Sequence, residues 1–173
     1  MARYVALLGG INVGGHRVAM ERLRTEFEAL GHSDVATFIA SGNVMFTAPR
    51  RRDHESRIAA HLEAQLGWPV PTFVRTAAEL VAAADLRPFG RTPDGHTHMV
   101  AFCRDAPDAD AATTIEASGT EVDRFEVHGR EVHWLIHGTV MSSKVNSTRL
   151  GKLTGPVTTR NITSLERLAD LVR

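Results

Sequence analysis

Tyr4–Gly15 reads YVALLGGINVGG, a short apolar run that ends in four glycines around the tripeptide INV. The apolar run favours a buried strand, and the glycines permit a tight turn with positive φ angles. A helix is expected from about Val18 to Leu30, where apolar residues recur every three or four positions. The stretch therefore predicts a strand, a glycine-rich turn and a helix start, whose bare backbone amides an anion or polar ligand can approach. We expect the side chains of Ile11 and Val13 to anchor this turn to the core.

The remainder of the first 75 residues contains three further strands and one helix. Val35–Ala40 and Val44–Thr47 are expected strands, joined by the tight turn Ser41-Gly42-Asn43. A helix is expected after the N-cap Asp53, and Pro71–Arg75 is a fourth short strand. The resulting order, strand–helix–strand–strand–helix–strand, is the split βαβ pattern of a ferredoxin-like domain.

The second half repeats this order after a connecting helix. The capping box Thr76 to Glu79 opens that helix, and Arg87–Gly95, with two prolines and two glycines, is the expected linker. The elements expected after the linker are a strand at 96–104, a helix at 108–118, strands at 121–128 and 131–137, a helix at 142–153, a strand at 157–160 and a last helix opened by the capping box Thr163 to Glu166, with Leu165, Leu168 and Leu171 facing inward. We therefore predict an α+β fold of two ferredoxin-like βαββαβ halves in tandem with an extra C-terminal helix. The expected domains are 1–86 and 96–173.

Composition and charge exclude some classes of protein. Hydrophobic residues make up 43% of the chain and charged residues 23%, which is ordinary for a globular protein and argues against wholesale disorder. Twenty basic and twenty acidic side chains cancel, which argues against the global positive field of a dedicated nucleic-acid binder. Residues 130–173 nevertheless carry seven basic and three acidic side chains, a local net charge of +4.

The cysteine count and the apolar runs indicate the compartment. The only cysteine, Cys103, lies in the apolar run MVAFC, so no disulfide can form within the chain and a buried, inert thiol is expected. The first apolar run ends at Leu8, which is too short for a signal peptide, and no stretch approaches the ~20 apolar residues of a membrane span. We therefore expect a cytoplasmic protein without a membrane partner.

The expected topology brings together a first group of loop residues. In a ferredoxin-like sheet the first and third strands are adjacent and antiparallel, so the end of one lies beside the start of the other. This places Gly10-Ile11-Asn12 beside Ser41-Gly42-Asn43. The candidate ligand-binding residues here are Asn12, Gly14, Gly15, Ser41 and Asn43. The alternative is that they are turn residues only, because glycine and asparagine are what tight turns require.

A second group is expected in the other half. The same reasoning places the end of its third strand, 137–138, beside the end of its fourth strand, 159–161, so the helix start at 142–144 is expected near Arg160. Free amides, hydroxyls, an ammonium and a guanidinium have the chemistry of a phosphate or oxyanion site. The candidate ligand-binding residues here are Ser143, Lys144, Arg160 and Asn161. The alternative is that a serine caps its helix while the two cations are solvated.

Known phosphate and RNA signatures do not fit. Gly10 to Gly15 has the spacing of a P-loop, but His16-Arg17 replaces the Lys-Ser/Thr pair that holds phosphate and magnesium. An RNA-recognition domain needs aromatic residues on its central strands, where SGNVMF supplies only Phe46.

Histidines offer a metal site as a further hypothesis. His96 and His98 lie on one strand face, where His133 or His137 could complete a ligand set. No carboxylate has metal-site spacing among them, and with nine histidines in the chain chance pairs are common, so no metal site is predicted.

Four motifs point to a family. ALLGGINVGG, SGNVMF, SSKV and TTRN, in this order, resemble the uncharacterised bacterial family catalogued as domain of unknown function 1697, over essentially the whole chain. The resemblance implies a two-part α+β fold related to the ferredoxin-like arrangement, and no established activity. The family pattern usually has arginine before GINVGG, where this chain has Gly9. If that arginine contacts a ligand in relatives, the resemblance implies different or weaker binding here.

Three functions remain open from the sequence. The leading hypothesis is binding of a phosphorylated or otherwise anionic small molecule at the two loop groups, with or without catalysis. The alternative is a non-enzymatic nucleic-acid-binding module, motivated by the +4 segment and a fold often used on RNA. The third is an interaction or scaffold protein whose motifs are structural. The sequence leaves open the ligand, any cofactor, the oligomeric state and whether the two loop groups share one cleft.

Overall fold

The computed structural model describes residues 1–146 and 148–173. Backbone packing divides the chain into two compact units, Met1–Ala82 with Leu168–Arg173, and Ala83–Arg167. Each unit contains one four-stranded sheet.

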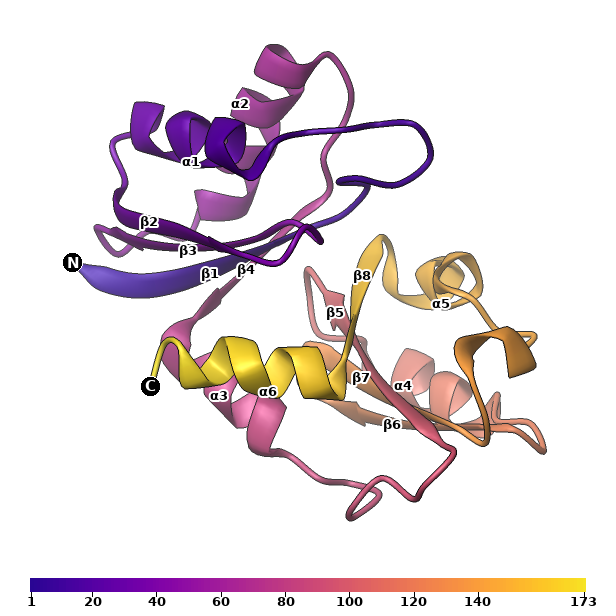
Figure 1. Cartoon of the computed structure of the whole chain (residues 1–173). Helices are drawn as coiled ribbons and strands as arrows, with labels where there is room; N and C mark the ends of the chain where they lie inside the picture. The colour runs from indigo at the N-terminus through magenta and orange to yellow at the C-terminus, as the bar shows by residue number, and fades with distance from the viewer. The chain divides into compact units, whose positions relative to one another are not determined.

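The first unit has the split βαβ topology. Its elements are β1 (Ala2–Leu8), α1 (Met20–Ala29), β2 (Ser33–Phe38), β3 (Asn43–Ala48), α2 (His54–Leu66) and β4 (Thr72–Thr76). The strand order is β2-β3-β1-β4, and all neighbours are antiparallel. Helices α1 and α2 lie on the same side of this sheet (Figure 1).

Alternation along β1 determines what the first sheet buries on its two faces. Tyr4, Ala6 and Leu8 belong to the apolar core beneath α1 and α2. Val5 and Leu7, which point to the opposite face, are fully buried as well. Because both faces are buried, the central strand is apolar without interruption, as the run YVALL predicts.

The second unit repeats the topology. Its elements are β5 (Thr97–Cys103), α4 (Ala109–Ala117), β6 (Asp123–His128), β7 (Glu131–Ile136), a 3₁₀ turn (Val140–Ser142), α5 (Ser147–Thr154) and β8 (Val157–Asn161). The strand order is β6-β7-β5-β8, again antiparallel throughout. β6 and β7 form a hairpin, and Phe125, Val132, Trp134 and Ile136 on one of its faces lie in the core with Ala101 and Leu150.

One further helix follows each sheet directly. α3 (Ala77–Asp85) begins after β4, and α6 (Ile162–Asp170) begins after β8. The predicted α+β fold of two βαββαβ halves with a C-terminal helix is thus confirmed. The segment Arg87–Gly95, predicted as a linker, belongs to the second unit.

Three details of the prediction are wrong. The helix expected at 142–153 is split, because the side chain of Asn146 accepts a hydrogen bond from Arg149 N and starts α5 only there. Val13 does not anchor the glycine-rich turn, since its side chain is exposed whereas that of Ile11 is buried. Leu171 lies beyond the end of α6 and is exposed, although Leu165 and Leu168 are buried as predicted.

The helices also bear on the question of membrane insertion. Among residues 1–146 and 148–173, no helix is both long and apolar enough to cross a membrane.

Candidate functional site

The first predicted loop group does come together, and its hydrogen bonds are internal. The Asn12 side chain donates from Nδ2 to Ala40 O at 2.9 Å, and its Oδ1 accepts from Val18 N at 2.9 Å. Asn43 Nδ2 donates to Ser41 Oγ at 2.8 Å. Leu8 N donates to Gly42 O, in the turn before β3, at 2.8 Å. These bonds tie the glycine-rich turn to the turn before β3, which is a structural role.

The glycines of this turn do not lie at a helix start. Gly14 and Gly15 are exposed and have positive φ angles, and a Cβ built on either would meet no atom within 4 Å. Residues 16–19 separate them from Met20, the first residue of α1. The predicted helix-terminal amides are therefore absent from the described turn, because the helix begins two residues later than its apolar periodicity indicated.

The second predicted group is divided between two faces of its sheet. The sequence predicted that the ends of the third and fourth strands of this half lie side by side. This is wrong, because β5 lies between β7 and β8. Ser143 and Lys144 precede the buried Val145, which packs in the core beneath α4 and α5. Arg160 is paired with Val100, whose side chain alternates away from that core, so its buried guanidinium lies on the other face. The four residues therefore do not form one cluster.

Each of these residues has a local structural role or is exposed. Ser143 Oγ accepts from Val145 N at 2.9 Å, whereas Lys144 is exposed. Arg160 donates to Thr158 Oγ1 and to a backbone carbonyl, and burial lowers its pKa to about 10. Asn161 Oδ1 accepts from Thr163 N at 2.9 Å and caps α6. The expected cap at Thr163 is thus replaced by Asn161, two residues earlier.

Strand register reveals a correspondence between the halves that inspection of the sequence missed. Tyr4 pairs with Thr76, the last residue of β4, and Met99 pairs with Asn161, the last residue of β8. Both Tyr4 and Met99 face the helix-covered side of their sheet. Positions in β1 and β5 therefore correspond one to one, with a helix beginning after each fourth strand.

In each half, the second-to-last residue of the fourth strand is a buried arginine. Arg75 and Arg160 are both buried, and each donates from Nη1 to the carbonyl of the residue before it, at 3.0 and 2.8 Å. The sequence signal for this repeat is the pair of dipeptides Arg75-Thr76 and Arg160-Asn161, each directly before a helix.

The first unit has a hollow of about 630 Å³ at this corresponding place. We call it the first hollow; its lining residues are Ala2, Arg3, Tyr4, Arg50, Arg51, Arg52, Thr76, Ala77 and Ala78. β1 supplies one wall, the segment between β3 and α2 supplies three arginines, and the first turn of α3 supplies the third wall.

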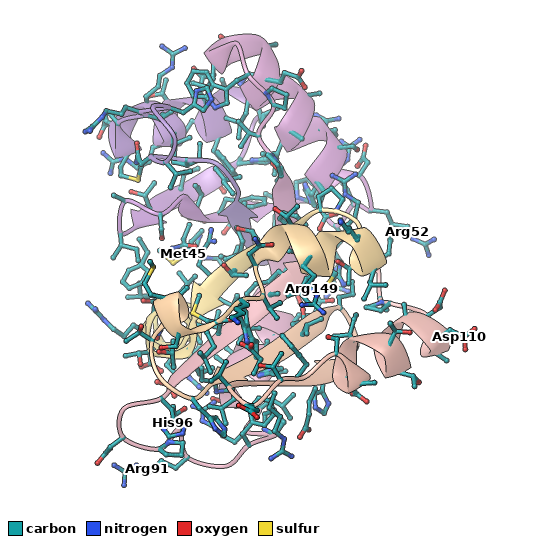
Figure 2. All side chains as sticks on the ribbon, turned by 90° about the vertical axis from the view of Figure 1, so that its right-hand side faces the viewer. Met45, Arg52, Arg91, His96, Asp110 and Arg149 are labelled. Atoms are coloured by element: carbon teal, nitrogen blue, oxygen red, sulfur yellow. The ribbon has the colours of Figure 1, made fainter. Side chains whose placement is uncertain are left out.

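The arginines of the first hollow differ in how they are held. Arg3 donates to Asp34 O at 2.6 Å, and Arg51 pairs with Asp53 at 2.9 Å. Arg50 and Arg52 make no hydrogen bond or ion pair to any residue that the structure describes. Figure 2 shows the side chain of Arg52 extending away from the ribbon. The hollow thus presents two guanidinium groups without partners.

The second unit has a hollow of about 450 Å³ in the corresponding place. We call it the second hollow; its lining residues are Arg87, Arg91, Thr92, His96, Thr97, His98, Asn161, Ile162, Thr163 and Glu166. It lies at the start of β5 and at the capped N-terminus of α6, as the first hollow lies at the start of β1 and of α3. Arg91 and His96, labelled in Figure 2, come from the segment that leads into β5.

Two buried histidines meet beside the second hollow. His98 Nε2 and His133 Nδ1 lie 3.0 Å apart and share one hydrogen bond. Burial, and secondarily the charge of Arg87, lowers the pKa of His98 to about 4. Burial together with neighbouring histidines lowers the pKa of His133 to about 3, so both rings are neutral at pH 7. The edge of Phe89 packs on His98, with 5.5 Å between ring centroids.

The four histidines considered as a possible metal set form separate pairs. The rings of His96 and His137 lie 4.7 Å apart, and those of His98 and His133 lie 5.2 Å apart. Within the part of the chain that the structure describes, no three His, Cys, Asp or Glu side chains are placed to hold a metal ion.

The comparisons with known proteins agree with this architecture. The conserved bacterial protein SP0830 from Streptococcus pneumoniae has a similar structure, with a TM-score of 0.79 and 21% sequence identity, over 99% of this chain and 98% of that one. No curated protein matches the sequence. The model of the family described as "Protein of unknown function (DUF1697)" matches residues 1–133, which confirms the predicted family; the motifs SSKV and TTRN lie outside the matched residues. The chain therefore belongs to the DUF1697 family.

Proposed function

We propose that this protein binds a phosphorylated or otherwise anionic small molecule in the first hollow. The observation that carries the proposal is the pair of unpartnered arginines, Arg50 and Arg52, in a hollow that no described acidic residue lines. Guanidinium groups match the oxygens of phosphates and carboxylates with paired, charge-assisted hydrogen bonds, so this arrangement suits an oxyanion.

The remaining walls support a ligand of small-molecule size. A volume of about 630 Å³ is in the range of small-molecule sites. The first turn of α3 closes one side of the hollow, and its N-terminus is capped by Glu79, whose carboxylate accepts from Thr76 N at 2.8 Å. Ala2, Ala77 and Ala78 give apolar surface beside the arginines. The combination suits a molecule with an apolar or aromatic body and a chain of phosphates.

The decisive test is binding of inorganic tripolyphosphate to a matched pair of variants. The double variant Arg50→Ala with Arg52→Ala removes the two free guanidinium groups. The control, Arg17→Ala with Arg57→Ala, removes the same charge from exposed positions of the same unit outside the hollow. Tripolyphosphate at a hundred times its dissociation constant is expected to stabilise the parent protein by about 2.7 kcal/mol. Calorimetric titration should detect binding, and thermal unfolding should show this stabilisation, for the parent protein and the control variant. Both the binding and the stabilisation should be lost in the Arg50→Ala, Arg52→Ala variant.

Two results would contradict the proposal. Equal weakening in both double variants would mean attraction by net charge alone. If neither tripolyphosphate nor nucleoside triphosphates stabilised the parent protein at low salt, the first hollow would not be a binding site for phosphorylated molecules.

The second candidate function is nucleic-acid binding at the same hollow. The observation that favours it is the run of three consecutive arginines, 50–52, all of which line the hollow. An oligonucleotide that neutralises several phosphates loses affinity steeply with salt. Fluorescence anisotropy with an octauridine probe separates the two functions: tighter binding of the probe than of uridine triphosphate, with a slope of several ions, would favour nucleic acid.

A further inference from the structure

The second hollow combines a helix N-terminus with buried imidazole groups that lack partners. His98 forms part of its wall and is only 1% exposed. Its Nδ1, and Nε2 of His133, have no hydrogen-bond partner among the described residues. Because the two neutral rings share a single bond, one outer nitrogen of the pair carries a proton and the other accepts one. A buried polar group left unsatisfied is costly, so a ligand that hydrogen-bonds to the pair would be stabilised by that bond.

The charge of the second hollow differs from that of the first. Apart from its histidines, its charged lining residues are Arg87, Arg91 and Glu166, a formal net charge of +1. Arg87 forms an ion pair with Glu166 across the hollow's rim, which leaves Arg91 for a ligand. Arg91 lies 3.9 Å from Asp94, and both of these side chains are almost fully exposed. The first hollow, by contrast, is lined by four arginines and no described carboxylate. The second hollow therefore does not suit a polyphosphate chain.

We propose that the second hollow binds a separate ligand, a small organic molecule that carries one oxyanion group, a carboxylate or a phosphate monoester. Arg91 and the N-terminus of α6, capped by Asn161, hold the oxyanion. The buried histidine pair, through His98, hydrogen-bonds to a neutral polar group of the same molecule. This site is independent of the proposed function of the first hollow, so the protein would hold two different ligands, one in each half.

The test uses inorganic phosphate and acetate as probes and histidine ring signals as the readout. Long-range proton–nitrogen NMR spectra of the full chain report the tautomer and surroundings of each ring. Either probe at millimolar concentration should shift the signals of His96 and His98 and leave His54 and His61, in the first unit, unchanged. A neutral tautomer of His98 should persist from pH 7.5 to pH 5.5.

Variants at exposed arginines keep the test independent of folding. Arg91→Ala should weaken the apparent affinity for both probes by about tenfold, as expected for one charge-assisted hydrogen bond. Arg149→Ala, an exposed arginine on α5 outside the hollow, should leave it unchanged. Arg50→Ala with Arg52→Ala should also leave it unchanged, which separates this site from the first hollow.

Three outcomes would overturn the proposal. The first is that neither probe shifts the ring signals of His96 and His98. The second is equal weakening by Arg91→Ala and Arg149→Ala, which would indicate general electrostatic attraction. The third is a His98 ring that titrates near pH 6.5 in the free protein, because that pKa would mean that the ring is exposed to water and not buried in the wall of the hollow.

Discussion

At the scale of single residues, Asn12 supports the packing of the glycine-rich turn. Its backbone has a φ of 57°, and its amide joins Ala40 O to Val18 N. Asn12→Ala should lower the free energy of unfolding by about 1–3 kcal/mol, because both partners lose their bond and a Cβ-bearing alanine has to adopt a left-handed conformation. Denaturant unfolding measures this change.

The matched variant is Asn12→Gly, which removes the same hydrogen bonds but tolerates the positive φ. It should lose less stability than the alanine variant, and Val13→Ser, at an exposed neighbouring position, should change little. An unfolding midpoint of Asn12→Ala equal to that of the parent would rule out the structural role.

Residue patterns could not foresee every backbone feature near this turn. The sequence predicts positive φ angles at glycines, and Gly42 has a φ of 74°. A side chain is excluded there for a second reason, because a Cβ would lie 3.0 Å from Ile11 Cβ. Ile39 nevertheless has a φ of 49°, a conformation that β-branched residues avoid. Nothing in the local sequence indicates it, and Ile39 lies in the short connection between β2 and β3. Gly9, where the family pattern has arginine, has room for a side chain only if Pro71 gives way slightly, with 3.3 Å between Cβ atoms.

At the scale of elements, periodicity and capping signals sufficed for the topology and not for the sites. The uninterrupted apolar run YVALL and the apolar alternation in FEVHGREVHW placed the strands, because the first pattern is typical of a strand buried on both faces and the second of a strand with one face in the core. Helix starts depended on single side chains: Asn146 was missed, so α5 was predicted too early. The first hollow joins three segments far apart in sequence, 2–4, 50–52 and 76–78, and the second joins two, 87–98 and 161–166. Only strand register brings these together, so neither hollow could be predicted from motifs.

The cap of α6 gives a prediction for one element. Asn161→Ala should cost about 1 kcal/mol, because Thr163 N loses the side-chain oxygen that it donates to at the start of the helix. Asn161→Ser should retain most of the stability, since serine also offers a capping oxygen. Urea unfolding of the two variants decides the point, and equal stability of the alanine and serine variants would show that the cap contributes nothing.

At the scale of the whole molecule, histidines held neutral by burial couple stability to pH. Burial is the main cause that lowers the pKa of His32 and of His98 to about 4, and of His133 to about 3. In the unfolded chain a histidine has a pKa of about 6.5, so below that pH the unfolded state binds more protons than the folded state. Stability should therefore be fully present above about pH 6.5 and decline as the pH falls towards 4.

This pH dependence can be measured separately from that of the carboxylates. The Arg51 hydrogen bond lowers the pKa of Asp53 below 3.8, so its contribution is lost only at more acidic pH. Each unit of lowered pKa corresponds to about 1.4 kcal/mol, so the buried pair His98 and His133 together should account for a loss on the order of a few kcal/mol between pH 7 and pH 4. Urea midpoints at pH 7.5, 6.0 and 5.0 should fall in that order for the parent protein. Replacing His98 and His133 together by glutamine, which cannot be protonated in this range, should flatten the profile whatever it does to stability at pH 7.5. A profile equally steep in the parent and in this double variant would show that the buried pair does not carry the effect.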